Sequence, residues 1–143
     1  REIVDYMRVY FDDMLEMIER FDPDILTHLT CPLRYIIGKF GRRVDLSLYR
    51  EPIERILQEI IRRSVALEVN TSSLGSPYDE LLPQREIIKR YYALGGRLIT
   101  LASDAHVAAN VAHGFDFAAE ELKKIGFVSA YYYKNRQAVP YTL

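Results

Sequence analysis

Two residues that commonly bind metal ions follow an apolar run in the second half of the chain. Ser103-Asp104-Ala105-His106 comes directly after Leu98–Ala102. In an extended segment, residues two apart project to the same side, so we expect Asp104 and His106 to converge on one point. Carboxylate and imidazole groups are suitable ligands for zinc, manganese or iron. Taken alone, the pair also fits an ordinary hydrogen-bonded loop, which is the commoner arrangement.

Other polar residues are expected at the ends of neighbouring strands. His28 ends the short apolar segment Asp24–His28, and Glu68 and Asn70 lie at the end of the apolar run Val65–Asn70. In α/β folds, ligands bind at the carboxyl ends of the strands. These residues are therefore candidates for the same site as the aspartate–histidine pair. For Glu68 and Asn70, hydrogen bonding to the following loop is an equally good explanation.

An arginine near His28 suggests an anionic ligand. Arg34 follows His28 by six residues and is within reach of the same face of the sheet. Arginine is the natural bidentate partner of a phosphate group, although a loop arginine is more often a solvated charge.

Two further residues are assigned no role in the site. We expect His113 to face solvent or cap a helix, and Arg136 to be a solvated charge.

Helices and short apolar strands must position these residues. Apolar residues at three- and four-residue spacing, together with proline and glycine signals, predict helices over residues 3–18, 52–63, 83–94 and 115–125. Strands are predicted over residues 24–28, 65–70, 97–102 and 127–133. This alternation indicates an α/β fold with a parallel sheet covered by helices. A closed eight-stranded barrel takes about 250 residues. Length and alternation alone therefore favour a small complete domain over half a barrel.

Composition excludes several classes of function. The chain has 143 residues, and its formal net charge is -1. This charge gives no general attraction to nucleic acid or to an anionic membrane, and no apolar run is long enough to span a bilayer. The single cysteine, Cys31, excludes an intrachain disulfide and fits a reducing compartment. We expect a cytoplasmic protein without nucleic-acid or membrane partners.

Four segments, in this order, carry a family resemblance: FDPDILTHLTCPLRYIIGKFG, ALEVNTSSL, GGRLITLASDAH, and GF followed by KNR. They resemble the C-terminal half of the PHP-type histidinol-phosphate phosphatases, where PHP stands for polymerase and histidinol phosphatase. The resemblance implies that residues 1–143 form a single partial domain. This domain would be the C-terminal part of a distorted (β/α)7 TIM-like barrel whose N-terminal half is absent.

The resemblance also implies a reaction and a set of site residues. The reaction is hydrolysis of L-histidinol phosphate to L-histidinol and phosphate, a step of histidine biosynthesis. It would use two or three divalent metal ions, either zinc, manganese or iron. His28, Asp104 and His106 match metal ligands of the family, and the latter two are also the catalytic candidates. Arg34 matches an arginine that grips the substrate phosphate, and we group two further substrate-binding candidates with it, Glu68 and Asn70.

The chain departs from the family pattern in two places. The N-terminal histidine-x-histidine signature is absent, so we expect the isolated chain to be inactive and to self-associate or recruit the missing half. Relatives often carry an arginine after the NTSSL segment, where this chain has Gly75-Ser76. That leaves two alternatives open. One is another PHP phosphoesterase acting on a nucleotide or small phosphomonoester, and the other is a non-catalytic barrel half serving as a binding or regulatory module.

Overall fold

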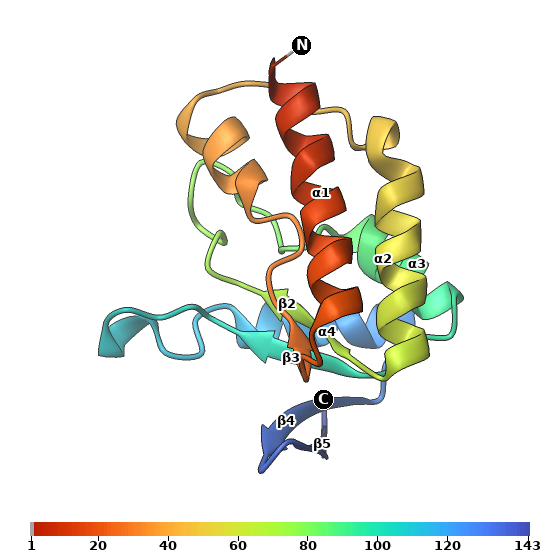
Figure 1. Cartoon of the computed structure of the whole chain (residues 1–143). Coiled ribbons are helices and arrows are strands. Elements are labelled where there is room, and N and C mark those ends of the chain that lie inside the picture. Colours follow the sequence, from red (N-terminus) through yellow and green to blue (C-terminus); the bar gives the residue numbers. More distant parts are fainter. Residues whose placement is uncertain (1) are drawn as a thin grey trace.

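The computed structural model describes residues 2–143 as helices that alternate with short strands (Figure 1). The helices are α1 (Glu2–Arg20), α2 (Arg50–Arg63), α3 (Arg85–Ala93) and α4 (Phe115–Ile125). The strands are β1 (Ile25–Leu26), β2 (Ala66–Asn70), β3 (Ile99–Ala102), β4 (Ser129–Lys134) and β5 (Gln137–Thr142). Three short helical turns are η1 (Arg34–Lys39), η2 (Leu46–Tyr49) and η3 (Ala108–Asn110). The predicted mixed α/β class and all four predicted helices are confirmed.

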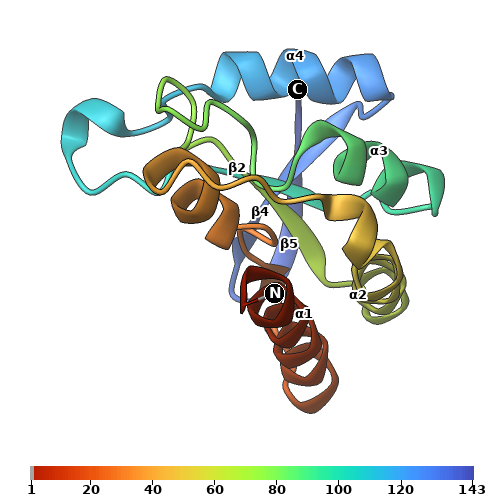
Figure 2. The same ribbon diagram turned by 90° about the horizontal axis from the view of Figure 1, so that it is seen from above.

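Amphipathic helices supply most of the core. The side chains that α1 buries recur every three or four residues: Met7, Phe11, Leu15 and Ile18. Helix α2 buries Ile53, Ile56, Leu57 and Ile60 in the same way. It packs against both α1 and β2. Figure 2 shows α4 and α1 on opposite sides of the molecule, with strands between them.

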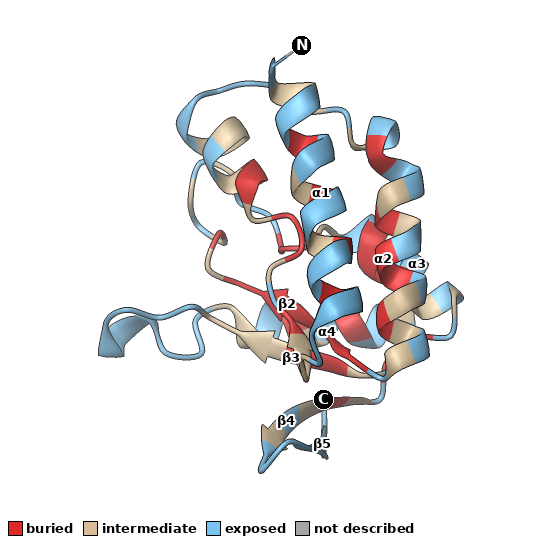
Figure 3. Ribbon diagram, in the orientation of Figure 1, coloured by how far each residue is buried: buried red, intermediate tan, exposed pale blue. Residues whose placement is uncertain are grey.

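The first three strands form a parallel sheet in the order β1-β2-β3. Strand β2 is central, and all five of its residues are buried (Figure 3). A strand covered on both faces is typical of parallel sheets in α/β proteins. Because side chains alternate along a strand, Glu68 and Asn70 share one face of β2 and Leu67 and Val69 share the other. The register places Asn70 beside Ala102, so β2 and β3 end at the same level.

The C-terminal strand does not extend this sheet, and the prediction of a fourth parallel strand over residues 127–133 is wrong. Strand β4 instead pairs antiparallel with β5 as a separate two-stranded hairpin. Asn135 and Arg136 connect the two strands, with φ values of 51° and 63°. A two-residue hairpin turn needs such positive φ values and usually signals itself by a glycine. This turn contains none, so the sequence pattern did not reveal β5.

The hairpin turn is held against the segment that leads into β1. Arg136 forms ion pairs with Asp22 and Asp24, which precede that strand. The expectation that Arg136 is merely a solvated charge is therefore wrong, because its exposed side chain has two acidic partners. Within residues 2–143, no helix combines the length and apolar character that crossing a membrane requires.

Candidate functional site

A pocket of about 490 Å³ opens at the carboxyl ends of β2 and β3. We call it the strand-end pocket. It is lined by Arg34, Ser72, Leu74, Ser103, Asp104, His106, Asn110 and His113. One wall comes from the loop after β2 together with η1, and the other comes from the loop between β3 and α4. Three of the predicted site residues, Arg34, Asp104 and His106, therefore lie at one pocket.

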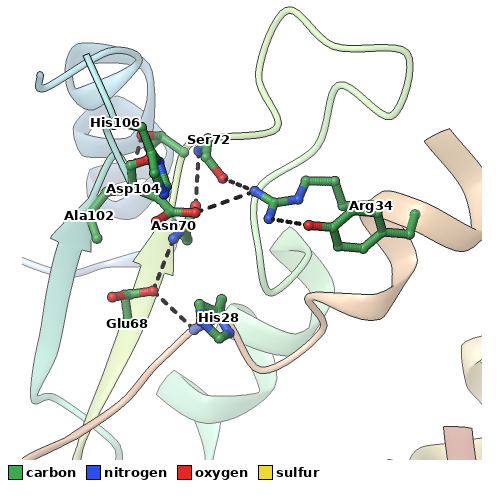
Figure 4. Close-up of polar contacts among 10 residues, drawn as sticks. His28, Arg34, Glu68, Asn70, Ser72, Ala102, Asp104 and His106 are labelled. Carbon is green, nitrogen blue, oxygen red and sulfur yellow. Dashed lines mark hydrogen bonds and ion pairs between the residues drawn. The ribbon is translucent and has the colours of Figure 1, made fainter. Parts of the chain in front are cut away.

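Arg34 reaches the pocket from η1 and contacts both walls (Figure 4). Its Nη1 donates a hydrogen bond to Ser72 Oγ at 2.8 Å and lies 3.5 Å from Asp104 Oδ2. Its Nη2 donates to the hydroxyl of Tyr35 at 3.1 Å. The guanidinium thus spans the end of the sheet and brings together residues that are 38 and 70 positions away in the sequence.

Charge at this site is concentrated on Arg34 rather than on the nearby thiol. Desolvation opposes the charge on Arg34, but the hydrogen bond to Tyr35 and nearby acidic groups outweigh it and raise its pKa. Desolvation raises the pKa of Cys31, and Arg34 offsets only part of this effect. The thiol therefore stays protonated at neutral pH, whereas a thiolate is the form that binds metal or attacks as a nucleophile.

Glu68 and Asn70 form a buried hydrogen-bond network below the pocket. Their side chains are almost fully covered, with exposed fractions of 8% and 2% for the two residues. Asn70 Nδ2 donates to Glu68 Oε1 at 3.2 Å, and Asn70 Oδ1 accepts from the backbone N–H of Ser72 at 3.0 Å. Neither residue lines the strand-end pocket. The sequence predicted them as substrate-binding, whereas the structure places them one layer behind the pocket wall.

Asp104 and His106 meet at the pocket through a turn, not through an extended segment. Strand β3 ends at Ala102, and Asp104 has a φ of 49°, so the premise of alternating extended residues is wrong. His106 Nδ1 lies 2.8 Å from the backbone oxygen of Asp104. Because a carbonyl only accepts, Nδ1 carries the hydrogen, and Nε2 of the neutral ring has the free lone pair. That nitrogen is suited to bind a metal or accept a proton.

His28 lies at the other end of the network from Asp104 and His106 (Figure 4). Strand β1 ends at Leu26, two residues earlier than His28, which has a φ of 31°. Its backbone N–H donates to Glu68 Oε1 at 3.0 Å. Its ring Nδ1 is buried and has no hydrogen-bond partner among residues 2–143. An imidazole nitrogen left in this state is available as a ligand.

The donor types at this site suit a divalent cation, but the part of the chain that the structure describes does not assemble a complete metal site. Two imidazoles and a carboxylate are typical zinc or iron ligands. No group of three or more His, Cys, Asp or Glu side chains among residues 2–143 is placed to hold a metal ion. His28, Asp104 and His106 therefore do not form such a group, and their role as ligands stays a prediction.

Several pocket residues were not identified from the sequence. Ser72, Ser103 and Asn110 lie in the same two loops as predicted residues, and only this proximity could have indicated them. His113 was predicted to face solvent or cap a helix, and its contact with the other wall of the pocket was not predicted. It lies in the turn before α4, with Nε2 at 3.1 Å from the backbone oxygen of Leu74. It thus lines the pocket and joins its two walls.

A larger hollow of about 1060 Å³ lies on the outer surface between η2, α2 and α3. Its lining combines apolar side chains with arginines and glutamates, which include the ion pair between Arg90 and Glu54. None of the six predicted site residues lines it. The strand-end pocket is the better candidate because it lies at the carboxyl ends of parallel strands and is lined by three of the predicted residues.

Known proteins with similar sequences include histidinol-phosphatases. The chain is 36% identical over 123 residues to a probable histidinol-phosphatase of Thermotoga maritima, covering 84% of this chain and 48% of that protein. The chain is similar to one half of a histidinol-phosphatase. It is also 28% identical over 130 residues to a probable histidinol-phosphatase of Clostridium acetobutylicum, covering 89% of this chain and 49% of that protein. No family model matches the chain.

A solved structure shares the fold. The histidinol phosphate phosphatase of Lactococcus lactis, crystallised with zinc, L-histidinol and phosphate, superposes with a TM-score of 0.74 at 22% identity. The superposition covers 92% of this chain and 50% of that one. The chain spans about half the length of the curated histidinol-phosphatases it matches. The resemblance to histidinol-phosphate phosphatases predicted from the sequence is confirmed.

Proposed function

We propose that this chain supplies the phosphate-binding half of a metal-dependent histidinol-phosphate phosphatase, which hydrolyses L-histidinol phosphate to L-histidinol and phosphate. The observation that carries the proposal is the placement of Arg34. Its guanidinium lies across the strand-end pocket, against Ser72 on one wall and Asp104 on the other. Paired N–H donors on a planar cation match the oxygens of a phosphate group. The relatives named histidinol-phosphatase make histidinol phosphate the first substrate to test.

The proposal includes a division of the fold. We place residues 1–143 as the C-terminal half of a distorted (β/α)7 barrel and assign its other half to residues outside this chain. Two observations support this division. Within residues 2–143 the parallel sheet has three strands, and β1 has a neighbour on one side only. The matched structure of the Lactococcus lactis enzyme is twice as long as the segment it shares with this chain.

We propose that His28, Asp104 and His106 hold divalent metal ions together with ligands from the other half. Zinc is the first candidate, since the similar Lactococcus lactis structure contains it. Bound divalent cations neutralise phosphate charge and act as Lewis acids. His28 Nδ1, which is buried without a hydrogen-bond partner within residues 2–143, and the free lone pair of His106 Nε2 support this assignment. The need for further ligands agrees with the lack of a three-residue metal group within residues 2–143.

The chain's own residues would bind and orient the substrate. Arg34 fixes the phosphate through its N–H donors, and the long 3.5 Å contact to Asp104 is weak enough for a phosphate oxygen to replace it. His106 would hold a metal ion at Nε2, because its Nδ1 is already committed to the backbone oxygen of Asp104. Both tasks are performed from the same pocket.

Phosphate release from L-histidinol phosphate with added zinc tests the proposal. The longer protein that contains this chain should release phosphate, and chelation should abolish the release. The isolated chain should be inactive, because most of the metal ligands would come from outside it. Arg34→Ala in the longer protein should lower kcat/KM by at least about 100-fold, the loss typical of removing a charged phosphate contact in a desolvated site.

A panel of other phosphomonoesters distinguishes the alternatives. Gly75-Ser76 stands where the family resemblance leads us to expect an arginine, and no atom lies within 4 Å of the place that a Cβ on Gly75 would occupy. A different small phosphomonoester or a nucleotide is therefore the second candidate. Preferential turnover of such a compound by the longer protein would favour it. If that protein bound no metal and hydrolysed none of the panel, a non-catalytic binding module would replace the proposal. Turnover of histidinol phosphate by residues 1–143 alone would refute the division of the fold.

A further inference from the structure

The guanidinium of Arg34 is held by two hydroxyl groups, from Ser72 and Tyr35. Ser72 Oγ accepts one N–H of Nη1, and the hydroxyl of Tyr35 accepts one N–H of Nη2. The guanidinium also lies over the ring of Tyr35, with 5.1 Å between Cζ and the ring centroid. An arginine has five N–H donors, so Nε and one N–H on each terminal nitrogen are left for Asp104 or a ligand.

The serine that holds Arg34 is itself fixed from below. Asn70 Oδ1 accepts from the backbone N–H of Ser72, a side-chain turn that sets the chain direction directly after β2. Asn70 cannot shift easily, since its backbone N–H and oxygen both pair with Leu82 and its Nδ2 donates to Glu68. Hydrogen bonds thus connect Glu68, Asn70, Ser72 and Arg34 in series. Glu68 and Asn70, at one end of this series, are buried.

We propose that Ser72 and Tyr35 are positioning residues, which orient the guanidinium of Arg34 toward the strand-end pocket, and that Asn70 and Glu68 support this arrangement through Ser72. The proposal rests on the proposed function in one respect, the use of Arg34 as a phosphate ligand. An unheld arginine side chain loses several freely rotating bonds when it binds, and prior ordering removes part of that cost. Ser72 and Tyr35 should therefore increase affinity for phosphate by ordering Arg34.

The first test measures orientation without any ligand. In ¹⁵N NMR spectra of the full 143-residue chain, the Arg34 terminal N–H signals should be resolved, because hydrogen bonds slow rotation of the guanidinium. Arg34→Lys removes and so assigns these signals. Ser72→Ala and Tyr35→Phe should broaden or average them, and Ser72→Thr, which keeps the hydroxyl, should restore them. Tyr35 is half exposed and Tyr35→Phe keeps the ring, so this variant is expected to fold.

The matched control is Ser76→Ala in the same loop. It removes a serine hydroxyl that accepts a hydrogen bond from the backbone N–H of Tyr78 at 3.2 Å, and within residues 2–143 Ser76 has no hydrogen bond to Arg34. Its Arg34 signals should match those of the unsubstituted chain. If Ser72→Ala and Tyr35→Phe both leave the Arg34 signals unchanged, the positioning role is overturned, whatever Arg34 binds.

The second test adds inorganic phosphate to the same proteins and follows the Arg34 signals and the backbone amides around the pocket. Arg34→Ala should weaken binding at least about tenfold, and Ser72→Ala and Tyr35→Phe should each weaken it about three- to tenfold. Ser76→Ala and Ser72→Thr should stay within about twofold of the unsubstituted chain. Equal binding by Arg34→Ala and the unsubstituted chain would overturn the phosphate role of Arg34. Loss of binding in Arg34→Ala with none in Ser72→Ala or Tyr35→Phe would overturn only the positioning role.

Discussion

The two loops that wall the strand-end pocket follow neighbouring parallel strands, yet they differ sharply in burial. Asn70 at the end of β2 is buried, as are Thr71 and Ser73 in the loop that follows. The backbone of Asn70 is hydrogen-bonded to Leu82 in the segment before α3, and that of Thr71 to Ala102 in β3. After β3, every residue from Asp104 to His113 is exposed (Figure 3), and Figure 1 shows this segment reaching away from the sheet. We call these the inner wall and the outer wall.

This difference separates two tasks. The inner wall is fixed by the fold of this chain and holds Arg34 in place through Ser72. The outer wall carries the metal-ligand candidates Asp104 and His106 but has few contacts of its own. Preorganised groups contribute most to binding, whereas exposed ligands need a bound ion or a covering partner to order them. If the proposed function holds, we expect this chain by itself to hold an anion more firmly than a cation.

The same substitution behind the inner wall and in the outer wall should give the largest contrast. Asn70→Leu should lower the free energy of unfolding by about 3 kcal/mol, because it leaves a buried carboxylate oxygen of Glu68 and the N–H of Ser72 without this partner. Asn110→Leu, in the exposed outer wall, should change it by less than about 0.5 kcal/mol. Urea unfolding followed by circular dichroism measures both. Equal losses in the two variants would contradict the division into walls.

The junction between the walls should give the next largest effect. A Cβ on Gly114 would lie 2.5 Å from Leu74 Cδ1, and the residue has a φ of 74°. Gly114→Ala should therefore lower the free energy of unfolding by about 2 kcal/mol, because of backbone strain together with overpacking. Gly41→Ala is the control, because Gly41 has a φ of 61° with no atom within 4 Å of such a Cβ. Gly41→Ala should lower the free energy of unfolding by about 1 kcal/mol. If urea unfolding gave equal losses for the two variants, close packing between the walls would be contradicted.

Removing one hydroxyl should loosen the outer wall selectively. Thr71 Oγ1 lies 2.6 Å from the backbone oxygen of His113 and 3.1 Å from that of Ala102. Thr71→Val should lower the free energy of unfolding by about 1 kcal/mol and increase the rate of amide hydrogen exchange in the segment 103–113. Thr30→Val makes the matched comparison. The Thr30 hydroxyl is buried without a hydrogen-bond partner within residues 2–143, so its loss should be neutral or stabilising.

The smallest effect is expected from the acidic group of the outer wall. Asp104→Asn removes a partly exposed charge whose only ion pair within residues 2–143 is the 3.5 Å contact to Arg34. Solvent screens such a contact, so the free energy of unfolding should change by less than about 0.5 kcal/mol. In the longer protein the same variant should lose most of its bound zinc, measured by elemental analysis. A stability loss above about 2 kcal/mol in the isolated chain would show that Asp104 has a structural role instead.

Residue periodicity predicted the elements of this fold but not all of their partners. Helices over residues 3–18, 52–63 and 115–125 were predictable because amphipathic spacing directly reflects which side of a helix is buried. The apolar run near the C-terminus was correctly recognised as a strand. Its antiparallel pairing was not predictable, because burial of a strand does not reveal its neighbour and the Asn135–Arg136 turn lacks the usual glycine.

The sequence by itself determined the chemistry available at the strand ends: an arginine, two histidines and an aspartate, each placed after a short apolar strand. It also carried the resemblance to histidinol-phosphate phosphatases. Only the tertiary structure decided that Arg34 is held by Ser72, that Glu68 and Asn70 lie behind the pocket, and that His113 lines it. Such contacts join residues dozens of positions apart, so they depend on strand register and helix packing, which no local pattern of residues specifies.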